Sequence, residues 1–94
     1  MNIYDELKDV WPVHIKPWKQ NGLIFCAAGL ASATSDPLKE RIYDLVQNSL
    51  EMEGVEEDVW KKVAYKLSVY AELIQLENKM NKLFLSDTKI FSSK

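Results

Sequence analysis

The sequence predicts an all-α protein, a small, compact four-helix bundle formed by a single domain, residues 1–94. Apolar residues recur at intervals of three and four along most of the chain, as they do in amphipathic helices. Neither Gly nor Pro occurs after Gly54, so no helix breaker interrupts the last forty residues. Hydrophobic residues make up 47% of the chain, a normal share for a folded domain. The four helices are expected over residues of about 2–11, 20–32, 37–52 and 56–84.

The first helix is followed by an irregular loop that is rich in Pro and Trp. Apolar side chains lie at helical spacing from Ile3 to Trp11, with charged residues between them. Pro12 ends this helix because it has no backbone N–H to donate. Pro12 and Pro17 lie five residues apart, so they exclude a regular helix between them.

The second and third helices differ in their pattern. Residues 20–32 are apolar on nearly all sides, which predicts a helix that is buried on most of them. For residues 37–52, Asp36 is the expected N-terminal cap, Pro37 suits the first helical position, and Gly54 supplies a stop. The apolar stripe of the third helix contains Leu38, Ile42, Leu45, Val46, Leu50 and Met52.

The fourth helix carries two apolar stripes that lie about 130° apart around its axis. The first contains Trp60, Val63, Leu67, Tyr70 and Ile74, and the second contains Val69, Leu73, Leu76, Met80 and Leu83. A straight helix of this length would protrude from a compact domain, whose radius of gyration would be roughly 12 Å. We therefore expect either a bend near residues 77–79 or contact between the last turns and a second copy of the chain. Ile90 and Phe91 are candidates to pack back onto the bundle.

Composition narrows the class of protein. The net charge is −2, which argues against general binding of nucleic acid, although residues 59–94 hold seven bases against three acids. The only cysteine, Cys26, cannot form an internal disulfide, and the N-terminus lacks the pattern of a signal peptide. The most apolar run, residues 22–34, is shorter than the roughly twenty residues that span a bilayer. We expect a cytoplasmic protein that binds neither nucleic acid nor membrane.

Candidate catalytic residues are few. His14 is the only histidine, and without a second ligand or base beside it we interpret it as an ordinary loop residue. Cys26 has apolar neighbours, which predicts a small, unreactive core residue. No metal-ligand spacing or phosphate-binding loop is present, and lysines 61, 62 and 66 suggest only a solvated helix face. We expect no enzyme activity, no cofactor and no metal; a small enzyme that uses His14 or Cys26 is a minor alternative.

Two groups of residues are the candidate binding site. The first is the acidic corner, five acids around the Gly54 turn: Glu51, Glu53, Glu56, Glu57 and Asp58. First-turn acids stabilise a helix, but Glu51 and Glu53 follow a helix end, where negative charge is mildly unfavourable. A focused negative potential would speed the encounter with a basic partner. The second group is Trp11 and Trp18, because Trp is common at interface hot spots.

These features favour a non-catalytic protein-binding module. The first hypothesis is a small cytosolic inhibitor, such as a toxin-immunity or phage-encoded inhibitor protein, whose acidic corner meets a basic protein partner. The alternative is a self-associating structural or adaptor protein, a possible homodimer. In that case the fourth helix forms the seam through Leu73, Leu76, Met80, Leu83 and Phe84.

Overall fold

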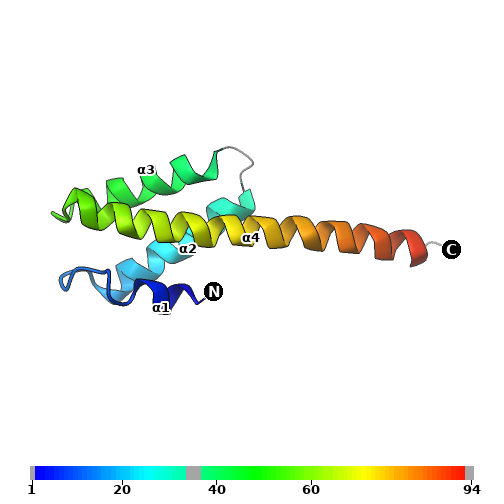
Figure 1. Ribbon diagram of the computed structural model, residues 1–94, viewed down its shortest axis with the longest axis horizontal. Helices are drawn as coiled ribbons and strands as arrows, with labels where there is room; N and C mark the ends of the chain where they lie inside the picture. The colour runs from blue at the N-terminus through cyan, green and yellow to red at the C-terminus, as the bar shows by residue number, and fades with distance from the viewer. Residues whose placement is uncertain (1, 34–36, 93–94) are drawn as a thin grey trace.

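The computed structural model describes residues 2–33 and 37–92, with side chains described as far as residue 83, and this part of the chain contains helices and no strand (Figure 1). The helices are α1 (Ile3–Leu7), α2 (Pro17–Ala33), α3 (Leu38–Glu51) and α4 (Glu57–Ser92). The all-α class and the four helices are therefore confirmed. The predicted cap Asp36 and the side chains of Phe84, Ile90 and Phe91 lie outside the described residues.

Helix α1 is shorter than the predicted helix over residues 2–11. The side-chain oxygen of Asn2 caps it by accepting from the N–H groups of Tyr4 and Asp5, at 3.0 and 3.4 Å. After Leu7 the chain forms a turn, in which the N–H of Val10 donates to the carbonyl of Leu7 at 3.0 Å. A residue that precedes Pro is disfavoured in the helical region. Pro12 therefore excludes a helix that continues through Trp11, and α1 already ends four residues earlier, at Leu7.

Helix α2 begins at Pro17, three residues before the predicted start at residue 20. The carbonyl of Lys16 accepts from the N–H groups of Lys19 and Gln20, at 3.0 and 3.1 Å. Pro17 loses no hydrogen bond at the first helical position, since the N–H there has no partner within the helix. This proline therefore starts α2, and residues 12–16, which lie between the two prolines, form no regular helix, as predicted.

The prediction that the second helix is buried on most sides is wrong. One side of α2 is buried, through Leu23, Ile24, Ala27 and Ala31. The other side faces outward, where Phe25 is 80% exposed and Cys26 is also exposed. Helices α3 and α4 pack against α2 on its buried side, so an all-round apolar pattern overstates its burial.

Helix α3 ends in a turn whose hydrogen bonds define a Schellman motif. The N–H of Val55 donates to the carbonyl of Leu50 at 3.1 Å, and the N–H of Gly54 donates to that of Glu51 at 3.0 Å. Gly54 has a φ of 77°, which a residue with a side chain rarely adopts. Leu50 and Val55, the positions of the apolar contact that frequently accompanies this motif, are both buried. The predicted stop at Gly54 is confirmed.

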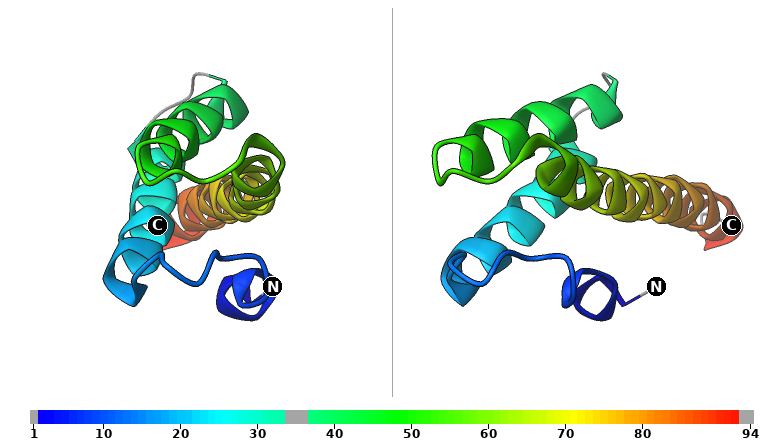
Figure 2. Two further views of the ribbon diagram at one scale, coloured as in Figure 1. Left: turned by 90° about the vertical axis from the view of Figure 1, so that its left-hand side faces the viewer. Right: turned by 60° about the vertical axis from the view of Figure 1, so that its left-hand side comes forward.

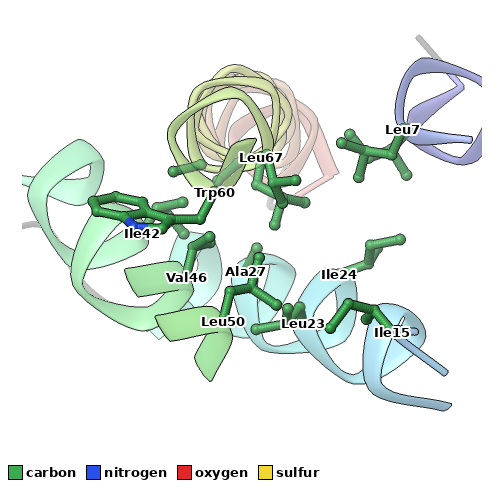
Figure 3. Packing of buried hydrophobic residues seen from close by; sticks show 14 of the residues in the cluster. Leu7, Ile15, Leu23, Ile24, Ala27, Ile42, Val46, Leu50, Trp60 and Leu67 are labelled. Carbon is green, nitrogen blue, oxygen red and sulfur yellow. The ribbon is translucent and has the colours of Figure 1, made fainter. Parts of the chain in front are cut away.

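The core lies between the first half of α4 and the other three helices (Figure 3). Its fully buried larger side chains come from α1, α3 and α4: Leu7, Ile42, Val46, Leu50, Val63 and Leu67. Trp60 is 5% exposed, and Tyr70 and Ile74 pack against the core, so the first predicted stripe of the fourth helix faces inward. Ile15 brings the Pro/Trp loop into the same core.

Helix α4 gives the molecule an elongated shape. Its 36 residues span about 54 Å at 1.5 Å per residue, close to the longest dimension of the molecule, 59 Å. Helices α1, α2 and α3 pack against its first half and leave one side of it open, and its second half projects beyond them without a bend near residues 77–79 (Figures 1 and 2). The radius of gyration is 16.1 Å, so the expected compact shape is wrong. The backbone of residues 90–91 continues this helix and does not fold back.

Candidate functional site

The second predicted stripe of the fourth helix forms an exposed apolar row on α4. Its four large side chains are between 44% and 68% exposed: Leu73, Leu76, Met80 and Leu83, here called the α4 row. At 100° per residue, the row lies roughly 180° around the helix from the buried residues Trp60, Leu67 and Ala71. Packing within the bundle therefore cannot cover it.

The spacing of the α4 row is that of a helix seam. Its members are separated by three, four and three residues, the pattern that faces a second helix in a coiled coil. Val69, four residues earlier on the same side, is half-buried and extends the row toward the bundle. The row thus offers a narrow apolar strip, which fits another helix better than it fits a compact ligand.

The acidic corner lies at the opposite end of the molecule from the projecting half of α4, where α3 turns into α4 (Figure 1). All five of its residues are exposed. The Schellman turn at Gly54 places Glu51 and Glu53 beside the first turn of α4, which carries Glu57 and Asp58. The structure therefore brings the five predicted acids to one corner.

The Pro/Trp loop and the first turn of α2 both contact this corner at Glu53. The carboxylate Oε1 of Glu53 lies 3.0 Å from Nζ of Lys19. The backbone carbonyl of Glu53 lies 2.9 Å from Nε2 of His14, and since a carbonyl only accepts, the imidazole is the donor. Sequence reasoning missed both contacts because the partners are 34 and 39 residues apart, and no local pattern links them.

A second acid of the corner is paired along α4. Oε1 of Glu57 lies 2.7 Å from Nζ of Lys61, one helical turn later. The hydrogen bond from Lys61, and then its positive charge, lower the pKa of Glu57 below its ordinary value. The hydrogen bond to Glu57 and its negative charge raise the pKa of Lys61. Both side chains are exposed, so the pair organises the charge of the corner more than it stabilises the fold.

The remaining acids keep their charge unneutralised. Glu51 accepts a hydrogen bond from the neutral amide of Gln47 at 3.0 Å. Within the described part of the chain, Glu56 and Asp58 have no ion pair or side-chain hydrogen bond. With Glu53 and Glu57 held by lysines, the corner is less negative than five acids suggest.

The two predicted tryptophans are in different environments. Trp11 is half-buried and packs against the core, as a lid over the bundle would. Trp18 is 74% exposed and lines a shallow pocket beside Glu53, together with His14, Ile15, Lys16 and Lys19. The structure thus joins Trp18 to the acidic corner and leaves Trp11 in a packing role.

The other residues considered for chemistry do not gather into a site. The predicted burial of Cys26 is wrong, since it is exposed on α2. Lys61 is paired with Glu57, and Nζ of Lys66 lies 3.2 Å from Oε2 of Glu6. No group of three or more potential metal ligands occurs in the portion that the structure describes.

Among the described helices, none combines the length and apolar character needed to cross a membrane.

Comparisons with known proteins returned no match to this chain, whether with protein-family models, curated proteins or solved structures.

Proposed function

We propose that this chain is a non-catalytic protein-binding module that binds a helical partner through the α4 row. The observation that supports this function is the exposure of four large apolar side chains at seam spacing on the outer side of α4. Large contiguous apolar patches are uncommon on monomeric proteins and mark interaction sites. In the row, apolar exposure coincides with the regular spacing of a helix seam.

The energetics favour a covered row. Full burial of a Leu or Met side chain is worth about 1.5–3 kcal/mol. Four such side chains that are half exposed therefore leave roughly 3–6 kcal/mol to be gained from a partner that covers them. The projecting half of α4 gains in a second way, because short helical segments are marginal in water without tertiary contacts.

Photo-cross-linking inside the native cell tests this function. A photoreactive amino acid at position 76 lies within the α4 row, and one at position 40 lies on the exposed surface of α3 as the matched control. We expect a specific protein adduct from position 76 and none from position 40. Equal labelling from the two positions, or no adduct from position 76, would contradict a binding role for the row.

A second candidate function is supported by the unpaired acids Glu56 and Asp58. In this case the protein is a cytoplasmic inhibitor, such as an immunity or phage-encoded inhibitor protein, whose acidic corner steers it onto a basic partner. Trp18 lies beside the corner and supplies an exposed apolar anchor. This candidate ranks second because Lys19 and Lys61 already pair with two of the five acids.

The test for the second candidate spares the two ion pairs. A photoreactive residue at position 56 identifies the partner, and stopped-flow mixing then measures its association rate with the wild type and with Glu56→Gln/Asp58→Asn. Steering requires a slower association in the variant and a weaker dependence on salt. Identical rates at low and high salt would refute it.

A further inference from the structure

Resting on the proposed binding role of the α4 row, we infer that its partner is a second copy of this chain, packed antiparallel with the two-fold axis between residues 74 and 75 of α4. The row alone does not choose between a parallel and an antiparallel seam. The charged residues that flank it do, because each arrangement places them opposite different neighbours.

The flanking charges follow from the spacing of the row. Leu73 and Met80 occupy the first apolar position of successive heptads, and Leu76 and Leu83 occupy the fourth. Glu72 and Lys79 precede the first position, and Glu77 follows the fourth. All three charged residues are exposed. These positions border a two-helix seam and set the orientation of the partner.

A parallel seam is disfavoured by these charges. In a parallel pair, the residue before the first apolar position faces the residue five places later in the other helix. Glu72 would then face Glu77 of the second copy, and symmetry would repeat this like-charge contact. The two bundles would also lie side by side at the same end of the dimer.

An antiparallel seam centred between residues 74 and 75 removes this conflict. Leu73 faces Leu76 of the second copy, and Val69 faces Met80 of the second copy. The two-fold axis repeats each of these pairs, so apolar side chains meet in four layers. Glu72 faces Lys79 of the second copy, and symmetry makes this attractive contact twice. The aliphatic stem of Lys66 covers Leu83 of the second copy at each end of the seam.

The neighbouring antiparallel register is disfavoured because it places like charges opposite each other. If the axis is moved to residue 78, the apolar layers still match, but Lys79 faces Lys79 of the second copy. Glu77 then faces Glu77 of the second copy as well. Among the three arrangements, the axis between residues 74 and 75 is the one that pairs opposite charges. It also lays each projecting half of α4 along the bundle half of the other copy, so neither projection stands alone.

Charge reversal measured by sedimentation equilibrium at low salt tests both the partner and the orientation. We expect the purified chain to be a dimer, and E72K or K79E alone to weaken dimerisation by about tenfold, since each turns two attractive contacts into repulsive ones. The double variant E72K/K79E restores opposite charges and is expected to return within about twofold of the wild type. E40K, which makes the same charge change on α3, is the matched control and should have no effect.

Three results would overturn the inference. A chain that remains monomeric at about 100 μM excludes the second copy. A tighter dimer in E72K indicates the parallel seam, because the introduced ammonium group would then face Glu77 of the second copy. Single variants that dimerise like the wild type indicate another register. A monomeric chain that still gives a specific adduct from position 76 would bind a different protein, so the proposed function would survive the loss of this inference.

Discussion

At the scale of single residues, Gly54 determines the geometry of the acidic corner. Its φ of 77° allows the chain to reverse within the Schellman turn, which sets Glu53 against Lys19 and His14. Apart from Gly54 itself and its two chain neighbours, no residue has a heavy atom within 4 Å of the place where a Cβ would be added. The demand for glycine at this position is therefore one of backbone conformation and not of space.

Replacing this glycine measures that demand. We expect Gly54→Ala to lower the free energy of unfolding by about 1–2 kcal/mol, the cost of a left-handed conformation for a residue with a Cβ. Gly29→Ala is the matched control, because this position is exposed within α2 and also has free space around it. There, Ala favours the helix and should raise stability by up to about 1 kcal/mol. Urea unfolding checks both, and a shift of the same sign in the two variants would contradict the prediction.

At the scale of elements, the sequence was most informative where one side of a helix is buried. The stripe from Trp60 to Ile74 predicted the inner side of α4, and Gly54 predicted the end of α3. Prediction failed for α2, because residues such as Phe25 look like core in any periodic pattern. Whether they are covered depends on how many helices pack around α2, which is a tertiary property.

In the candidate site, features formed by residues close in sequence could be predicted, and contacts between residues far apart in sequence could not. The acids of the corner could be predicted because they are close in sequence, and the Glu57–Lys61 pair follows from helical spacing. The pairing of Glu53 with Lys19 joins two elements that are 34 residues apart. Only the packing of the start of α2 against the end of α3 brings these groups together, so sequence spacing held no signal for the pair.

Leu50, in the last turn of α3, and Met52, just after its end, test the assignment of the inner side of this helix. Leu50 is fully buried, whereas Met52 is exposed at the helix end. We expect Leu50→Ala to lower the free energy of unfolding by about 2–5 kcal/mol, since it removes apolar contacts and leaves a cavity. Met52→Ala, a change of similar size, should stay within about 0.5 kcal/mol of the wild type. Thermal and urea unfolding give both values, and comparable losses would show that α3 is rotated from the position described.

At the scale of the whole molecule, α4 determines both the elongated shape and the position of the exposed α4 row. Its first half supplies the inner side of the bundle, and its second half carries the α4 row away from that bundle. One uninterrupted helix therefore carries the core-forming residues in its first half and the exposed α4 row in its second half. Within one copy of the chain, the acidic corner lies at the far end of the molecule from the projecting half of α4 (Figure 1).

The elongated shape can be measured on the isolated chain. The variant Leu76→Glu/Met80→Glu should remain folded, because both side chains are exposed, and charges on the row prevent a second helix from covering it. Small-angle scattering of this monomer should give a radius of gyration near 16.1 Å and a longest dimension close to 59 Å. A compact chain of this length would give about 12 Å. A value near that figure would mean that α4 bends or folds back in solution, and the row would then face the bundle instead of a partner.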